Sequence, residues 1–159
     1  MSAHVLVRVP GKINLQLSVG PLQKDGFHPV ATVFQAVSIF DDVKVELNDD
    51  GLVHVQSTGK TNNHLPLDRE NLAAKAVELM RKKFDISDGI TITLTKEIPI
   101  AGGMAGGSAN AGAAIVGMDA LFNLGLKRND MEKIGAELGA DVPFTISGGT
   151  AIGTGWLNG

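Results

Sequence analysis

The chain has 159 residues, 43% of them hydrophobic, which is enough for one sizeable core, and we expect a single domain over residues 1–159. Its 17 acidic and 14 basic residues give a net charge of -3, which argues against a broad nucleic-acid-binding surface. The lack of cysteine excludes disulfides, thiolate catalysis and cysteine-based zinc sites. No apolar run is long enough for a signal peptide or a membrane span, so we expect a cytoplasmic protein without a membrane partner.

Strands are predicted in the first third of the chain. Residues 12–19 alternate cleanly, which predicts a half-buried strand with one apolar face and one polar face that carries Lys12 and Asn14. The Asp49-Asp50-Gly51 turn predicts a hairpin between the last two strands of this region. The other predicted segments here are a strand over 4–9, a break at Pro10-Gly11, a polar loop over 23–28, and strands over 30–40, 43–47 and 52–56.

Helices are more frequent in the remainder of the chain. The predicted segments are a helix over 71–84, a strand over 90–95, a helix over 108–122, a helix capped by Asn129 and ending at Gly139, a turn over 140–144 and a strand over 150–153. Strands and helices do not alternate regularly. The sequence therefore predicts an α+β fold, with helices packed on a mixed, mainly antiparallel sheet.

The most informative segment is the glycine-rich stretch at 99–109, which has four glycines in six positions before a helical run. Glycine allows close backbone approach, and a helix N-terminus presents unpaired N–H groups, so this segment predicts a phosphate site. It is not a Walker A loop, because Ser108 and not lysine follows Gly107, and it contains no G-x-G-x-x-G. A glycine-rich packing turn between strand and helix is the alternative.

Other candidate residues each have an ordinary alternative. Asp141 follows a predicted helix end and precedes a proline, and the pattern by itself favours an Asx-turn or a helix cap. Lys12 is by itself a solvated strand lysine, but Asn14 shares its face. Phe27 and His28, after an Asp-Gly turn, can grip a flat heterocycle, although a turn followed by a core phenylalanine fits equally. The other histidines lack metal-ligand spacing and are expected at the surface: His4, His54 and His64.

Four motifs taken together closely resemble the 4-diphosphocytidyl-2-C-methyl-D-erythritol kinase family. This family belongs to the superfamily of galactokinase, homoserine kinase, mevalonate kinase and phosphomevalonate kinase. The motifs occur in the family's order over nearly the whole chain: Pro-Gly-Lys-Ile-Asn-Leu at 10–15, Asp-Gly-Phe-His at 25–28, Pro-Ile-Ala-Gly-Gly-Met-Ala-Gly-Gly-Ser-Ala-Asn at 99–110 and Leu-Gly-Ala-Asp-Val-Pro-Phe at 138–144.

The resemblance implies a fold like domain 2 of ribosomal protein S5 and ATP-dependent phosphorylation of the 2-hydroxyl of a cytidine-diphosphate methylerythritol, in the non-mevalonate route to isoprenoids. It implies that Asp141 takes the hydroxyl proton and that Lys12 holds and polarises that hydroxyl. Asn14, Phe27 and His28 would hold the substrate and its cytidine end. ATP and Mg²⁺ are the implied cofactors, with no side chain assigned to the metal. The implied ATP loop consists of Pro99, Ile100, Ala101, Gly102, Gly103, Met104, Ala105, Gly106, Gly107, Ser108 and Ala109.

The chain departs from the family's pattern at three places. Phe27 replaces the usual tyrosine and keeps its stacking face, and Asn110 stands where many members carry aspartate. The sequence from Trp156 onward replaces the usual Gly-x-Gly-Glu continuation, and the chain stops about where the family's first domain ends. We therefore expect the family's second domain to be absent and turnover to be weak or absent. The alternatives are a non-catalytic nucleotide-binding fragment, which self-associates through the surface left by that domain, and another small-alcohol kinase of the superfamily.

Overall fold

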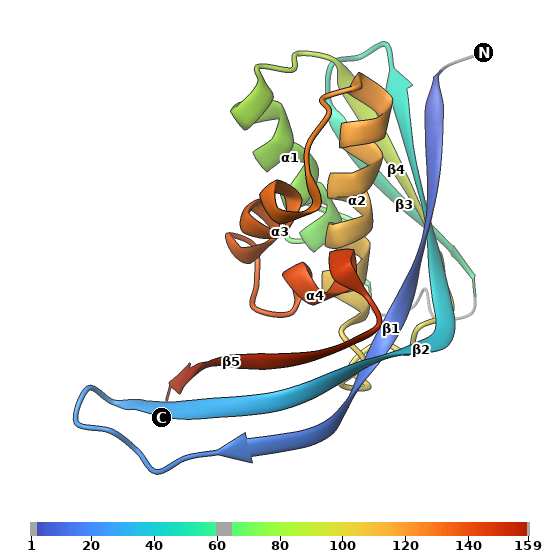
Figure 1. Ribbon diagram of the computed structural model, residues 1–159. Coiled ribbons are helices and arrows are strands. Elements are labelled where there is room, and N and C mark those ends of the chain that lie inside the picture. The colour runs from blue at the N-terminus through green and yellow to red at the C-terminus, as the bar shows by residue number, and fades with distance from the viewer. Residues whose placement is uncertain (1–2, 60–64, 159) are drawn as a thin grey trace.

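The computed structural model describes residues 3–59 and 65–158, in which helices cover one face of a twisted sheet (Figure 1). A long hairpin extends beyond the helical layer at the bottom of the figure. The elements in chain order are β1 (His4–Val19), β2 (Phe27–Asn48), β3 (Val53–Gly59), α1 (Leu72–Phe84), β4 (Gly89–Lys96), α2 (Gly106–Phe122), α3 (Arg128–Ala136), α4 (Val142–Ser147) and β5 (Thr150–Asn158).

The sheet is built around β2. Its strand order is β1-β2-β4-β3, and β5 pairs with β2 as well. All pairings of β2 are antiparallel, whereas β3 runs parallel to β4. β4 pairs with residues 42–48 of β2 and β5 with residues 27–35, so that the two partners follow one another along the same strand. The predicted α+β class with a mixed, mainly antiparallel sheet is confirmed.

The first two strands are longer than the sequence predicts. β1 continues through Pro10-Gly11, where the register with β2 shifts between Pro10 and Lys12. A β-bulge accommodates such a shift without ending the strand. Likewise, the two segments predicted at 30–40 and 43–47 are parts of the single strand β2. In both strands, a break in the hydrophobic pattern does not correspond to the end of a strand, and in β1 it corresponds to a local irregularity in strand pairing.

The predicted hairpin at 49–51 is wrong, although its turn forms. The Leu52 N–H donates to Asp50 Oδ1 over 2.9 Å, but β4 lies between β2 and β3. Burial explains the order, because the apolar face of β4 (Ile90, Ile92 and Leu94) is fully buried and needs a central place. The residues of a turn can reverse the chain direction, but they do not determine which strand will pair with the next one.

Small residues let α2 lie close to its neighbours. A Cβ on Gly117 would come 2.6 Å from Val45 Cγ2 of β2, and one on Gly112 would come 2.2 Å from Thr145 Oγ1 of α4. α1 packs beside α2, and the Asn71 side chain caps it by accepting from the Ala73 N–H over 2.9 Å. None of the helices in the part of the chain that the structure describes is long and apolar enough to cross a membrane.

Element ends after residue 100 differ from the prediction where tertiary packing decides them. α2 starts at Gly106, two residues before the predicted start. α3 is preceded by Lys127 as its N-cap, not by Asn129, and ends at Ala136 and not at Gly139. The predicted turn at 140–144 contains the start of α4, and β5 continues to Asn158, paired all along with β2. Local propensity carries no information about which distant segment a helix or strand packs against, so it does not predict these element ends.

The two faces of residues 12–19 are not buried as expected. Lys12 is buried, whereas Leu15 and Leu17 on the apolar face are 60% and 57% exposed. This stretch lies in the part of the hairpin that extends past the helices (Figure 1), so its apolar face has no layer packed on it. The polar face instead meets the glycine-rich segment, because Lys12 contacts that segment directly.

Candidate active site

The glycine-rich segment connects β4 to α2 as an open anion-binding turn. Its backbone takes left-handed φ values at Ala101 (60°), Gly103 (70°) and Ala105 (56°). Ala105 is the N-cap of α2, and no side chain in the described residues makes a capping hydrogen bond there. The first-turn N–H groups of a helix lack intrahelical partners and lie at its positive end. The N–H groups at the start of α2, at Gly106 and Gly107, are therefore the ones at the positive end of the helix.

Lys12 joins β1 to this loop. The Lys12 N–H donates to the Met104 carbonyl over 3.1 Å, and its Nζ donates to the Gly103 carbonyl over 3.1 Å. Nζ also donates to Asn14 Oδ1 over 2.7 Å. The bulge after Pro10 places these donors, so the interpretation of Lys12 as a solvated strand lysine is wrong.

Asp141 faces the same ammonium group. It occupies the N-cap position of α4, as its sequence pattern favours, but its side chain makes no capping hydrogen bond there. Asp141 Oδ2 lies 3.9 Å from Lys12 Nζ, with the carboxylate partly exposed and the lysine buried. A hydroxyl oxygen at about 2.8 Å from both atoms fits between them, and catalytic contacts tighten on substrate binding. The pair can therefore orient an alcohol and accept its proton.

A short hydrogen-bond chain and two aromatic rings support the pair. Asn14 Nδ2 donates to Thr32 Oγ1 over 2.6 Å, and the Thr32 hydroxyl donates to the Gln16 carbonyl over 2.7 Å. Lys12 Nζ lies 5.4 Å from the centroid of the Phe34 ring, which stacks on Phe144 at 5.0 Å. A cation over a ring face is stabilised electrostatically, so Phe34 favours the charged lysine at this place.

The pair opens onto a groove along the hairpin. A hollow of about 300 Å³ is lined by Lys12, Asn14, Asp141 and Trp156, among others. A neighbouring hollow of about 610 Å³ shares Trp156 with it and reaches Gly20 near the tip of the hairpin. The first hollow lies on the face of β2 that carries Thr32 and Phe34, whereas Pro29 and Ala31 place the second on the opposite face of that strand.

Phe27 and His28 lie at the start of β2 and not beside the pair. The His28 Nδ1 lies 2.8 Å from the Gly20 carbonyl, which can only accept, so Nδ1 carries the proton there. Four residues separate His28 from Thr32 along β2, or about 13 Å at the rise of a strand. Phe27 is partly exposed, and is not a core residue. Because neighbouring side chains of a strand alternate, Phe27 and His28 face opposite sides of the hairpin.

Several side chains of the site were not predicted from the sequence. Thr32 and Phe34 lie on the same face of β2 as His28, and the two-residue period of a single long strand would have found them. Asp41 and Lys96 form a buried ion pair beneath the loop, together with Asn110. In the sequence, a charged residue stands at the end of each of two buried strand segments, and this pattern could have revealed the pair.

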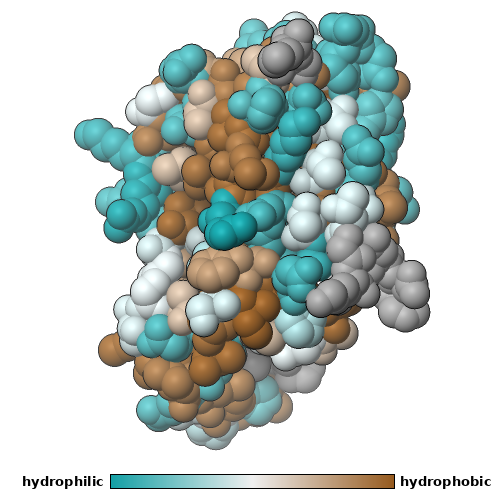
Figure 2. Space-filling view, turned by 90° about the vertical axis from the view of Figure 1, so that its right-hand side faces the viewer, coloured by the Kyte–Doolittle hydropathy of each residue, from teal (hydrophilic) through white to brown (hydrophobic). Residues whose placement is uncertain are grey.

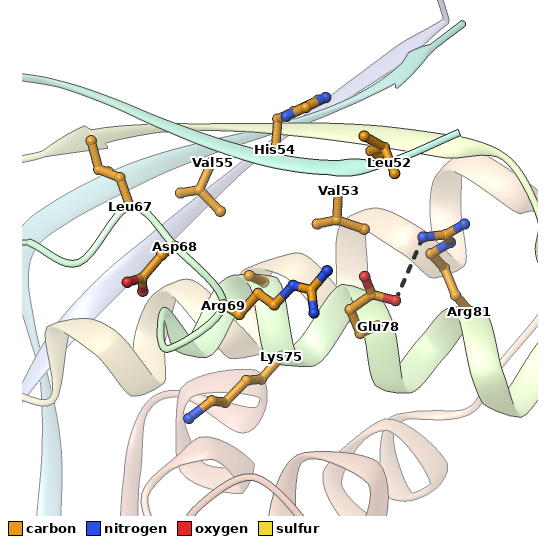
Figure 3. Close-up of a pocket in the computed structure, with 11 residues that line it drawn as sticks. Leu52, Val53, His54, Val55, Leu67, Asp68, Arg69, Lys75, Glu78 and Arg81 are labelled. Atoms are coloured by element: carbon orange, nitrogen blue, oxygen red, sulfur yellow. Dashed lines mark ion pairs between the residues drawn. The ribbon is translucent and has the colours of Figure 1, made fainter. Parts of the chain in front are cut away.

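A second groove, of about 540 Å³, lies between β3 and α1 and contains none of the predicted residues. In Figure 3, Val53 and Val55 point from β3 toward the helix, whereas His54 points away from it. Arg81, which lines this groove, already has partners. Its guanidinium lies 3.5 Å from the Glu78 carboxylate and donates a 3.1 Å hydrogen bond to the Gly51 carbonyl.

The histidines expected at the surface do not form a metal site in the described part of the chain. His4 and His54 are exposed, as predicted, and His54 pairs with Asp50 over 2.6 Å. His64 lies outside the described residues. Across residues 3–59 and 65–158, no group of three or more His, Asp or Glu side chains could hold a metal ion.

Comparison with known proteins supports this geometry. The model of the "GHMP kinases N terminal domain" matches residues 71–149. The 4-diphosphocytidyl-2-C-methyl-D-erythritol kinase of Mycolicibacterium vanbaalenii is 49% identical over 154 residues, which are 97% of this chain and 47% of that protein. The enzyme of the same name from Mycobacterium tuberculosis is 47% identical, over 97% of this chain and 48% of its own length. The chain thus spans about half the length of the curated relatives it matches.

Solved structures agree with the sequence comparison. A crystal structure of 4-(cytidine 5'-diphospho)-2C-methyl-D-erythritol kinase is 33% identical with a TM-score of 0.80, covering 95% of this chain and 52% of that one. A homoserine kinase from Cytophaga hutchinsonii, at 20% identity and a TM-score of 0.72 over 98% of this chain and 51% of that one, shares the fold. Along 97% of its length the chain is therefore similar to about half of a 4-diphosphocytidyl-2-C-methyl-D-erythritol kinase, and its residues 71–149 match the N-terminal domain of the GHMP kinases.

Proposed function

We propose that this chain is the ATP-binding and proton-transfer domain of a kinase that phosphorylates the 2-hydroxyl of 4-diphosphocytidyl-2-C-methyl-D-erythritol in the cytoplasm. One observation carries the proposal. The Lys12 ammonium lies 3.9 Å from the Asp141 carboxylate and donates to Gly103 of the glycine loop over 3.1 Å, so an alcohol site and a phosphate site adjoin. The sequence similarity supports the substrate.

The reaction follows from these positions. Asp141 accepts the proton of the substrate hydroxyl as its oxygen attacks the γ-phosphorus, the bond to the β-phosphate oxygen breaks, and ADP leaves. Lys12 orients the hydroxyl, and the N–H groups at the start of α2 bind the phosphates. The hollow beside the pair would hold the substrate, and His28, farther along the same face of β2, would contact its cytidine end.

Mg²⁺ would arrive on the phosphates of ATP and neutralise their charge during transfer. Magnesium sites of this kind use one or two carboxylates and the substrate's phosphates. Asp141, whose carboxylate faces Lys12, and the Ser108 hydroxyl at the start of α2 would supply oxygen ligands. The residues present therefore fit an ion bound mainly by the nucleotide.

Calorimetry with AMPPNP, a non-hydrolysable ATP analogue, tests the phosphate site. We expect Gly103→Val to weaken binding by about tenfold or more, because a β-branched residue cannot keep the left-handed φ of this loop. Gly125→Val is the matched control, since Gly125 has the same φ of 70° but lies between α2 and α3. Equal affinity of the two variants, or no binding by the wild type, contradicts the proposal.

Single-turnover transfer from ATP, with the chain in excess over the cytidine substrate, tests the chemistry. We expect slow transfer at most, and a further loss of about 10²–10⁴-fold in Asp141→Asn. Asp130→Asn on α3 is the control. Transfer that survives Asp141→Asn contradicts the role of Asp141, and rapid turnover contradicts the expected weakness of this chain alone. An alcohol lacking the cytidine moiety separates this kinase from others of the superfamily.

A second candidate function, self-association of a nucleotide-binding domain, is favoured by the exposed apolar surface. In Figure 2, hydrophobic surface gathers in the lower part of the molecule, at the height of the extended hairpin. Leu15, Leu17 and Trp156 are all more than half exposed in this region, and Ile152 is 80% exposed. Exposed apolar surface of this extent is typical of an interaction site.

A further inference from the structure

Three buried polar side chains lie beneath the glycine loop and take no part in the proposed proton transfer. Asp41 of β2, Lys96 of β4 and Asn110 of α2 are each at most 1% exposed. Lys96 Nζ donates to Asp41 Oδ2 and, over 2.9 Å, to Asn110 Oδ1. Asn110 Nδ2 donates to Asp41 Oδ2 over 2.8 Å, which closes the triangle. Buried charges need such partners, so the three side chains depend on one another.

The second oxygen of Asp41 binds the start of the loop. Asp41 Oδ1 accepts from the N–H groups of Glu97 and Ile98, both over 2.8 Å, directly after β4 ends. Asn110 lies in the second turn of α2, directly after the loop. A single carboxylate on β2 is therefore hydrogen-bonded to the backbone that enters the loop and to the helix that leaves it.

The loop between these two points has a backbone that needs such support. Ala101 and Ala105 have left-handed φ values of 60° and 56°, which L-residues other than glycine adopt only at a conformational cost. Such conformations persist where the surrounding structure determines them. The cluster also lies close to Gly106 of the loop, since a Cβ on Gly106 would lie 3.2 Å from Lys96 Nζ.

We propose that Asp41 is a positioning residue that, with Lys96 and Asn110, holds the glycine loop in its phosphate-binding conformation before nucleotide arrives. The inference rests on the proposed ATP site. It adds a role for β2, whose middle lies under the loop while its first half lines the substrate groove. Preorganised N–H donors bind an anion without first ordering the loop, so the cluster acts on nucleotide affinity through the backbone.

Two variants and a destabilised control test this role. Asp41→Asn keeps an acceptor for the Glu97 and Ile98 amides but leaves Lys96 buried without a counter-charge. Asn110→Ala keeps the ion pair and removes only the link to α2. Met118→Ala, fully buried farther along α2, is the control because it creates a cavity in the core without touching the cluster.

Amide hydrogen exchange and AMPPNP calorimetry give separate readouts. We expect exchange at residues 101–107 to accelerate by about tenfold relative to the amides of β4 in both cluster variants, with a similar loss of AMPPNP affinity. Met118→Ala should lower global stability and leave the loop-to-core exchange ratio and the affinity unchanged. A constant ratio in the cluster variants, or an equal change in Met118→Ala, overturns the proposal. If Asp41→Asn does not fold, Asn110→Ala still tests the proposal. If the wild type binds no nucleotide, the exchange ratio still tests whether the cluster holds the loop.

Discussion

Lys12 is a buried cation, and the groups around its ammonium explain why a charge is tolerated there and where the side chain points. Two oxygen acceptors, the face of Phe34 and the Asp141 carboxylate lie around its Nζ. A buried ammonium is tolerated only with such partners, so truncating it would release the loop contact and the orientation of the substrate hydroxyl together. The role of this residue therefore depends on contacts with three separate elements.

A second ion pair gives the fold a pH dependence. Arg8 binds both oxygens of Asp42, over 2.8 Å and 2.9 Å, across β1 and β2. The hydrogen bond from the guanidinium lowers the pKa of Asp42 below its usual 3.8, partial burial opposes this, and the charge of Arg8 adds to the lowering. A carboxyl group with a lowered pKa in the folded state stabilises the fold above its unfolded pKa, and this contribution is lost as the pH falls through the folded value.

We predict that Arg8→Met lowers the free energy of unfolding at neutral pH and that its difference from the wild type shrinks as the pH falls below about 4. Urea unfolding at several pH values measures this difference. Asp42→Asn should cause a similar loss at neutral pH, and the double variant should add little to either. A difference between wild type and Arg8→Met that stays constant down to about pH 2 would show that the ion pair is not its source.

Among the elements, α2 combines two requirements. Its first turn must expose N–H groups to an anion, and its remaining turns must lie close to α4 and β2. Glycine serves both purposes but at different positions. Gly112 and Gly117 allow close packing, whereas Gly107 faces only Leu72 Cδ1, at an ordinary contact distance of 3.5 Å from a built Cβ.

We predict opposite effects of the same substitution within α2. Gly112→Ala places its Cβ 2.2 Å from Thr145 Oγ1 and should destabilise the protein by about 1–3 kcal/mol. Gly107→Ala meets no such obstacle and should stabilise it by about 0.4–1 kcal/mol, because alanine loses less backbone entropy on folding. Chemical denaturation of both variants measures the two changes. Equal losses would mean that helix packing does not distinguish the two glycines.

For the whole molecule, the long hairpin of β1 and β2 determines where ligands and partners can bind. One part of it meets the glycine loop and α4 at Lys12, and the rest extends past the helices (Figure 1). The groove and the exposed apolar residues both lie on this extension. The domain therefore presents its proposed substrate site on a surface that nothing in the described residues covers.

We predict that the chain self-associates in a concentration-dependent manner through this surface, as measured by analytical ultracentrifugation. Leu17→Ser should shift the equilibrium toward the monomer, because it removes apolar surface from the interface. Leu6→Ser is the control, since Leu6 is similarly exposed, at 64%, but lies near the other end of β1. A monomer at all concentrations, or equal effects of the two substitutions, would contradict the prediction.

The sequence by itself determined the fold class, most elements and the motifs of the site. Hydrophobic periodicity and glycine clustering are local properties, and they indicated the helix at Leu72–Phe84, the strand at Gly89–Lys96 and the turn that leads into α2. Family resemblance supplied the pairing of Lys12 with Asp141, which no spacing in the sequence predicts. The structure places the two charged groups 3.9 Å apart.

Three features depended on tertiary contacts: which strands are neighbours, the burial of Lys12 within the otherwise exposed residues 12–19, and what supports the glycine loop. The hairpin prediction failed because β4, from a later part of the chain, takes the place beside β2. Asp41 and Lys96 are 55 residues apart, and they form their ion pair only because the sheet brings them together. Burial and ion pairing depend on long-range contacts, and a local pattern of residues contains no information about which distant segment will pack against it.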